Sequence, residues 1–186
     1  GANRYLPEYL QNETGIKMLG TISVLLRGIP FIYQGQEIGM TNIKLDDINA
    51  YNDINTIDQY HQAIERGFSK EDALALCNLY SRDNARTPMQ WSDETEGGFT
   101  TGTPWFPVNP NYRQINVATQ MDDPTSIISF YSALLALRKN KIYENVFVYG
   151  RFEPAYEEIK DVFAFYRRAE EGYALIVSNW GKENIT

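Results

Sequence analysis

A short segment rich in arginine is the part of the sequence best equipped for chemistry. Residues 81–91 read Ser-Arg-Asp-Asn-Ala-Arg-Thr-Pro-Met-Gln-Trp. Arg86 follows Arg82 by four residues and Asp83 by three, so the three side chains would share a face in one helical turn. Asp83 would then orient one guanidinium while the other points outward. A planar fork of N–H donors suits sugar hydroxyls or carboxylates, and Trp91 would add a flat apolar wall for a sugar ring.

The same segment has a second, purely structural interpretation. It can be a surface cluster of ion pairs beside a core tryptophan, because exposed ion pairs are common and contribute little to stability. The residues alone leave both interpretations open.

The elements before this segment indicate one step of a (β/α)8 barrel. Residues 13–27 have helical apolar spacing and predict a helix that Gly28 ends. Residues 29–33 are wholly apolar and predict a buried parallel strand. Barrel chemistry lies on the loops that follow the strands, and residues 34–42 occupy such a loop. Glu37 is therefore either a ligand-facing carboxylate or an anchor for an arginine.

The remaining elements change from helical to strand periodicity along the chain. Apolar spacing and capping residues predict helices at 54–66, from a cap at Ser69 to Tyr80, and from Asp122-Asp123-Pro124 to about Asn140. A long loop at 92–114 separates the last two. Period-two patterns then predict strands at 142–149, 162–166 and 173–177. A sheet of these strands alone has open edges, so we expect it to continue in further strands.

Composition excludes several classes of function. The net charge of −7 and the pI near 4.8 argue against nucleic acid or an anionic membrane as a partner. No apolar run of membrane-spanning length is present. The single cysteine, Cys77, sits among apolar residues, where we expect it to be buried, and it favours a reducing, cytoplasmic compartment. The single histidine, His61, has no partner ligands nearby in sequence, so we expect no metal, and no motif indicates a cofactor.

Three blocks of sequence resemble glycoside hydrolase family 13, in the group of oligo-1,6-glucosidases, dextran glucosidases and related α-glucosidases. The first block is residues 28–42, Gly-Ile-Pro-Phe-Ile-Tyr-Gln-Gly-Gln-Glu-Ile-Gly-Met-Thr-Asn. The second is the arginine segment at 81–91, and the third covers residues 97–105 and 108–112. The family usually has Glu where this chain has Gln36, so one negative charge is missing there.

The resemblance implies a fold of α/β plus all-β class. Residues 1–140 would form the C-terminal end of a (β/α)8 barrel, with a long active-site loop and its inserted helices at 41–121. Residues 141–186 would begin an antiparallel β-sandwich domain. A barrel alone needs about 250 residues, and the chain has 186 with neither an initiator Met nor a secretory leader at its start. We therefore expect the C-terminal part of a longer α-glucosidase.

The resemblance also assigns roles in binding α-glucoside oligosaccharides. Arg86 would reach the glucose held beside the nucleophile, and Asp83 would orient Arg86. Arg82 would pair with Glu37, and Asn84 would cap the local turn. Retaining hydrolysis needs two carboxyl groups about 5 to 5.5 Å apart. In the family these lie on earlier barrel strands, and a third essential Asp lies in an Asn-His-Asp motif. None of these motifs occurs in the chain, so we expect no catalytic residue and no hydrolysis by the chain alone.

Other functions remain open at this stage. Trp91, Trp105 and Tyr112 could be the platforms of a free-standing carbohydrate-binding module. A structural unit that self-associates through an exposed barrel edge is another possibility. Sucrose isomerases and trehalose-6-phosphate hydrolases carry similar C-terminal segments, so the resemblance does not choose among these enzymes.

Overall fold

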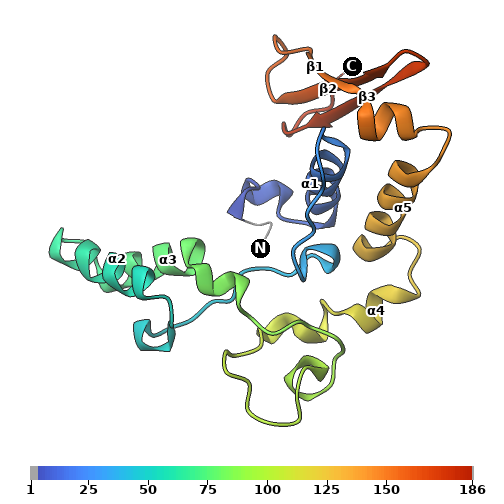
Figure 1. Ribbon diagram of the computed structural model, residues 1–186. Coiled ribbons are helices and arrows are strands. Elements are labelled where there is room, and N and C mark those ends of the chain that lie inside the picture. The colour runs from blue at the N-terminus through green and yellow to red at the C-terminus, as the bar shows by residue number, and fades with distance from the viewer. Residues whose placement is uncertain (1–3, 186) are drawn as a thin grey trace. The chain divides into compact units, whose positions relative to one another are not determined.

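The computed structural model describes residues 4–185 and separates into two compact units. Residues 4–5 and 34–122 form the first unit, and residues 6–33 and 123–185 form the second (Figure 1). The arginine segment and the long loop around it belong to the first unit. Each unit has a hydrophobic core of its own and is described separately.

Two helices form the helical layer of the second unit. Helix α1, Glu13–Leu25, begins at Asn12, whose side chain accepts the N–H of Gly15, and it confirms the helix predicted there. Helix α5, Ile127–Lys139, packs against α1 (Figure 1). The predicted start of this second helix is wrong. Ser126 is the capping residue and accepts the N–H of Ser129, because the carboxylate of Asp123 is already bonded to Thr125.

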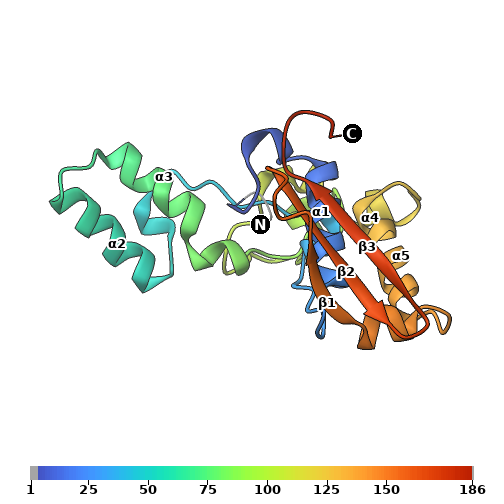
Figure 2. The same cartoon turned by 90° about the horizontal axis from the view of Figure 1, so that it is seen from above.

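A three-stranded antiparallel sheet completes the second unit. Its strands are β1 (Arg151–Ala155), β2 (Val162–Ala169) and β3 (Gly172–Asn179), in that order across the sheet (Figure 2). The last two confirm the strands predicted at 162–166 and 173–177. Phe165 of β2 lies opposite Ile176 of β3, and both side chains are buried.

The core of the second unit joins the helices to the sheet. Its buried members are Val24, Leu25, Ile127, Tyr131, Leu134, Phe147, Phe165 and Ile176. Two buried arginines close this core at the end of α1. Arg138 donates to the carbonyl of Val24 (2.7 Å), and Arg167 donates to the carbonyl of Leu25 (2.6 Å). The cationic side chains thus bind the carbonyl groups that the end of the helix leaves unpaired.

The strand predicted at 29–33 does not form. Ile29 and Phe31 are 82% and 84% exposed, whereas the prediction placed both faces of this run in a core. A parallel strand needs a neighbouring strand for its hydrogen bonds. Among residues 4–185 the only sheet is β1–β2–β3, whose strands pair with one another.

The strand predicted at 142–149 is also wrong. Asn145–Tyr149 is a short π-helix, and Ile142 is 79% exposed. The side chain of Asn140 accepts the N–H of Ile142 and begins a turn that the following residues continue. Phe147 then reaches the core from helical backbone. The first strand is instead β1, which contains Pro154 and escaped the period-two pattern.

The first unit is built around a pair of helices. Helices α2 (Ile54–Glu65) and α3 (Lys70–Tyr80) pack side by side (Figures 1 and 2). The hydroxyl of Ser69 accepts the N–H of Asp72 and caps α3, as predicted. The core of this unit contains Ile43, Leu45, Tyr51, Cys77 and Phe106. Cys77 is buried and His61 is exposed.

The rest of the first unit is mostly irregular. It contains one further short helix, α4, at Val117–Met121. Single 3₁₀ turns occur at Gln36–Ile38, Ile48–Ala50, Arg82–Ala85, Thr95–Gly98 and Pro110–Arg113, and at Glu8–Leu10 in the second unit. Across residues 4–185, no helix combines the length and the apolar composition that crossing a membrane requires.

Candidate functional site

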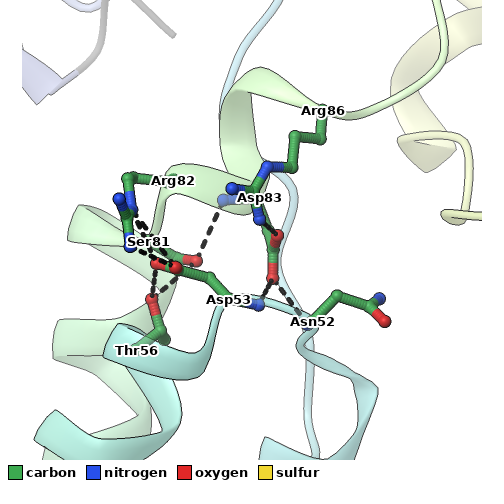
Figure 3. A network of polar contacts seen from close by, with 7 residues as sticks. All are labelled: Asn52, Asp53, Thr56, Ser81, Arg82, Asp83 and Arg86. Carbon is green, nitrogen blue, oxygen red and sulfur yellow. Dashed lines mark hydrogen bonds and ion pairs between the residues drawn. The ribbon is translucent and has the colours of Figure 1, made fainter.

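The arginine segment forms a tight turn around a buried carboxylate. The 3₁₀ turn Arg82–Ala85 follows α3, and the hydroxyl of Ser81 accepts the N–H of Asp83 (3.1 Å). Arg86 ends the turn, and its Nη1 donates to Oδ1 of Asp83 at 2.8 Å (Figure 3). Asp83 is fully buried, whereas the Arg86 side chain is 39% exposed. The predicted pairing of these two side chains is confirmed.

The second oxygen of Asp83 binds the backbone before helix α2. Oδ2 accepts the N–H of Asn52 (2.7 Å) and the N–H of Asp53 (2.9 Å) (Figure 3). One buried carboxylate thus fixes both Arg86 and the start of α2. Charge-assisted hydrogen bonds of this kind are the strong ones in proteins.

Arg82 has a different partner from the predicted one. Its Nη2 donates to Oδ1 of Asp53 at 2.7 Å, and its Nε donates to the same carboxylate at 3.1 Å. The predicted pair of Arg82 with Glu37 is therefore wrong. The backbone N–H groups of Asn52 and Asp53 bind Asp83, the residue next to Arg82. These bonds bring the carboxylate of Asp53 within reach of the Arg82 guanidinium.

Asp53 is a member of this cluster that the sequence did not single out. It is 3% exposed, and its carboxylate also accepts from the hydroxyl of Thr56 at 2.7 Å. Burial raises the pKa of Asp53, but the hydrogen bonds from Arg82 and Thr56 outweigh burial and hold the pKa below its usual value. No sequence spacing pointed to it, because Asp53 lies 29 residues before Arg82.

The ion pairs leave several guanidinium donors available. Among residues 4–185, no protein group accepts from Nη1 of Arg82 or from Nε and Nη2 of Arg86. Arg82 is therefore held through two nitrogens and Arg86 through one, each by a buried carboxylate, and both present other N–H groups for a ligand. This arrangement suits acceptors such as the hydroxyl oxygens of a sugar.

Glu37 lies in the 3₁₀ turn Gln36–Ile38 of the same unit. The turn is flanked by Gly35 and Gly39, which both have the left-handed backbone conformation that glycine tolerates. One carboxylate oxygen, Oε2, is buried and has no hydrogen-bond partner within the described part of the chain. A buried oxygen without a partner is costly, so Glu37 is a candidate for a polar contact with a ligand or another protein group.

Asn84 does not cap the turn as predicted. Its Oδ1 accepts the N–H of Ile43 (3.1 Å), and its Nδ2 donates to the carbonyl of Asn78 (3.0 Å). Ser81 supplies the cap instead, because its short hydroxyl already reaches the first free N–H of the turn. Asn84 thus connects the arginine segment to the loop that follows Glu37.

The aromatic side chains of the candidate platforms differ in exposure. Trp91 is 51% exposed and Trp105 is 70% exposed, while Tyr112 is half-buried. The backbone N–H of Trp91 donates to the carbonyl of Gly97 (2.8 Å), which holds the long loop against the arginine segment.

A surface hollow occurs in the second unit. Its volume is about 580 Å³, and it is lined by Asn145, Tyr149, Gly150, Arg151, Arg168, Ala169, Glu170 and Glu171. None of the residues predicted to bind substrate lines it. As for metals, residues 4–185 contain no group of three or more His, Cys, Asp or Glu side chains that could hold an ion.

Comparison with known proteins gives a consistent set of relatives. The sequence profile of the alpha-amylase catalytic domain matches residues 4–150. The oligo-1,6-glucosidase of Halalkalibacterium halodurans is 45% identical over 161 residues, which are 87% of this chain and 28% of the relative. The trehalose-6-phosphate hydrolase of Bacillus subtilis is 38% identical over 178 residues, which are 96% of this chain and 31% of the relative.

Solved structures agree with the sequence relatives. The trehalose-6-phosphate hydrolase of Bacillus licheniformis superposes with a TM-score of 0.84 at 37% identity, covering 93% of this chain and 30% of the other. The trehalulose synthase of Pseudomonas mesoacidophila gives a TM-score of 0.84 at 38% identity, with 92% and 30% coverage. The chain thus spans less than a third of the length of these relatives.

Proposed function

The chain belongs to the alpha-amylase family of glycoside hydrolases, and we propose that it supplies part of the sugar-binding pocket of a longer α-glucosidase. This enzyme would hydrolyse α-1,6- or α-1,4-glucosidic bonds at the non-reducing end of short oligosaccharides with retention of configuration. The proposal rests on the family and on the share of each relative's length that the chain covers. Relatives that match nearly all of this chain are about three times its length, so their remaining segments have no counterpart here.

The proposed division of the chain follows from the same family. Residues 1–140 belong to the C-terminal end of a (β/α)8 barrel, with the loop 41–121 at its active site. Residues 141–186 begin a C-terminal β-sandwich domain. Helices α2 and α3, expected within the loop 41–121, and two of the three strands expected in residues 141–186 support this division.

The observation that carries the proposal is the Asp83–Arg86 pair. A fully buried carboxylate holds a guanidinium that is 39% exposed, and the free donors of that guanidinium are those a glucose hydroxyl needs. Arg86 would thus meet a sugar hydroxyl with a guanidinium that Asp83 already holds in place. We assign Arg86 to direct contact with the bound glucose and Asp83 to its orientation.

Arg82 and Glu37 are assigned secondary binding roles. Arg82 presents donors beside the same turn, and Glu37 presents a carboxylate oxygen without a partner in the described residues. The catalytic carboxylates would lie on segments that the longer enzyme supplies. No metal or cofactor is needed for this reaction class, in which two carboxyl groups suffice. The single, buried Cys77 suits a cytoplasmic enzyme.

Two relatives carry the names of enzymes with other reactions. The substrate preference of the whole enzyme would distinguish among these reactions. A trehalose-6-phosphate hydrolase and a trehalulose synthase both resemble this chain as closely as several oligo-1,6-glucosidases do. We favour the oligo-1,6-glucosidase reaction because the relative with 45% identity carries that name. Parallel assays with isomaltose, maltose, sucrose and trehalose 6-phosphate test this choice.

The direct test compares the chain alone with a chimaera. In the chimaera the chain replaces the matching segment of the Halalkalibacterium halodurans oligo-1,6-glucosidase. We expect no glucose release from isomaltose by the chain alone and clear release by the chimaera. Sustained turnover by the chain alone would mean that a complete active site lies within it, and the proposal would then be wrong. Sugar binding by the chain without turnover in the chimaera would favour a carbohydrate-binding module.

Self-association is a second candidate property, favoured by one observation. Ile29 and Phe31 are more than 80% exposed in a run that forms no strand in the described structure. Exposed apolar runs of this kind mark association surfaces. Sedimentation of the chain over a range of concentrations should show reversible association, which Phe31→Ser weakens. A constant monomer at all concentrations would exclude it.

A further inference from the structure

We propose that Asp53 is a positioning residue for sugar binding, acting through Arg82. In this proposal Asp53 fixes one edge of the Arg82 guanidinium so that the remaining donors of Arg82 bind a hydroxyl of the α-glucoside. The inference rests on the proposed function, because it assigns Arg82 to the same sugar pocket as Arg86.

The first argument is the position of Asp53 at the start of a helix. Asp53 occupies the capping position of α2, where an Asp side chain ordinarily accepts a backbone N–H of the first turn. Its side chain makes no such capping bond. The carboxylate points to Arg82 and Thr56 instead (Figure 3). Asp53 thus gives up the usual capping bond and directs its carboxylate to Arg82 and Thr56.

The second argument is the asymmetry of the ion pair. Asp53 is 3% exposed, whereas the Arg82 side chain is 66% exposed. An arginine this exposed gains little stability from an ion pair. Nε and Nη2 of Arg82 both bind the carboxylate, so the plane of the guanidinium is fixed and Nη1 remains for a ligand. Fixing the donors before the ligand arrives lowers the entropy that binding costs.

The third argument is that Asp53 itself is rigidly held. Thr56 donates to its Oδ2 at 2.7 Å and also contacts the hydroxyl of Ser81 at 3.0 Å. The backbone N–H of Asp53 donates to Asp83, the carboxylate that orients Arg86. Both arginines are therefore anchored to one hydrogen-bonded frame, drawn in Figure 3. The same frame that places Arg86 places Arg82.

A double-mutant cycle in the chimaera tests this inference. Asp53→Asn, Arg82→Gln and the double variant are assayed with isomaltose, and KM and kcat are determined separately. We expect Asp53→Asn and Arg82→Gln each to raise KM about tenfold, the effect of one charge-assisted hydrogen bond. The double variant should match Arg82→Gln alone, because Asp53 acts only through Arg82. A loss of folded enzyme would lower the apparent kcat and leave KM unchanged.

A second measurement does not depend on activity. In the 186-residue chain, the NMR signal of the Arg82 Nε–H should be slow to exchange with water in the parent and fast in Asp53→Asn. Glu153→Gln is the matched control, since Glu153 accepts from Nε of Arg168 at 2.8 Å in the sheet. That control should leave the Arg82 signal and the KM for isomaltose unchanged.

The outcomes separate this inference from the proposed function. Additive effects in the cycle, or an unchanged Arg82 signal in Asp53→Asn, would overturn the positioning role. If Arg86→Ala lowers kcat/KM while Asp53→Asn leaves KM at the parent value, only the inference on Asp53 fails. If Arg86→Ala leaves the activity of the chimaera intact, the proposed function fails as well.

Discussion

Asp83 is the residue on which the arginine segment depends. It is fully buried, and its two oxygens accept from Arg86 and from the backbone N–H groups of Asn52 and Asp53. Spacing in the sequence predicted its pairing with Arg86, because residues three apart meet in one helical turn. The backbone contacts were not predictable, since a side chain that binds N–H groups 30 residues away leaves no local pattern.

Removing the Asp83 carboxylate should destabilise the chain strongly. Asp83→Ala leaves the buried N–H of Asp53 and the part-buried N–H of Asn52 without an acceptor, and Arg86 without its partner. We expect a loss of about 3–5 kcal/mol in the free energy of unfolding, measured by urea titration. Glu153→Gln, which breaks a half-exposed pair with Arg168, should cost less than about 1 kcal/mol. Equal losses for the two variants would contradict the central place of Asp83.

The charge of Asp53 gives a second prediction, on pH. Its pKa is lowered in the folded state, because hydrogen bonds from Arg82 and Thr56 outweigh burial. A lowered pKa stabilises the fold above the unfolded value of about 3.9, and this stabilisation is lost as the pH falls through the lower, folded value. The difference in unfolding free energy between the parent and Asp53→Asn should therefore be constant from about pH 6 to 8 and shrink below about pH 4. A difference that grows on acidification would contradict this assignment.

At the scale of elements, helices were predictable where periodicity and caps agreed. Helices α1, α2 and α3 fall where apolar spacing placed them, and Ser69 caps α3 as expected. The start of α5 was misplaced because the carboxylate of Asp123 binds Thr125, and Ser126 rather than Asp122-Asp123-Pro124 begins the helix.

Two short apolar runs of the chain do not form the strands that their composition indicated. The runs at 29–33 and 142–149 both suggested strands, and neither forms one. A strand is defined by its partner, and composition alone does not reveal whether a partner is present. Strands β2 and β3 were predictable because a tight turn joins them and makes each the partner of the other.

The packing of α1 on α5 can be tested at one glycine. A Cβ at Gly20 would lie 2.9 Å from the ring of the buried Tyr131. Gly20→Ala should therefore destabilise the chain by about 1–2 kcal/mol, since overpacking exceeds the helix-propensity gain of an alanine. Gly172→Ala, where a Cβ meets nothing within 4 Å, should be close to neutral. Thermal unfolding of both variants checks this, and a stabilised Gly20→Ala would show that α1 and α5 pack less closely than described.

At the scale of the whole molecule, the chain consists of two compact units of different character. The first contains the arginine segment, Glu37 and the exposed side chains of Trp91 and Trp105. The second contains the sheet. The chain spans between 28% and 31% of the length of relatives such as those from Halalkalibacterium halodurans and Bacillus subtilis. The proposed sugar binding is therefore best tested inside a longer enzyme, which the chimaera provides.

The measurement that tests the central claim most directly is the kcat/KM of the chimaera for isomaltose after substitution of Arg86. We expect Arg86→Ala to lower kcat/KM by about 100-fold or more, because a charge-assisted contact with the bound glucose is lost, equivalent to about 3 kcal/mol. Arg86→Lys should recover only a small part, since an ammonium cannot bind Asp83 and a sugar with the same fixed geometry. Arg151→Ala, at an exposed arginine of β1, serves as the control. A value for Arg86→Ala within about threefold of the parent would contradict the assignment of this segment to the sugar-binding pocket.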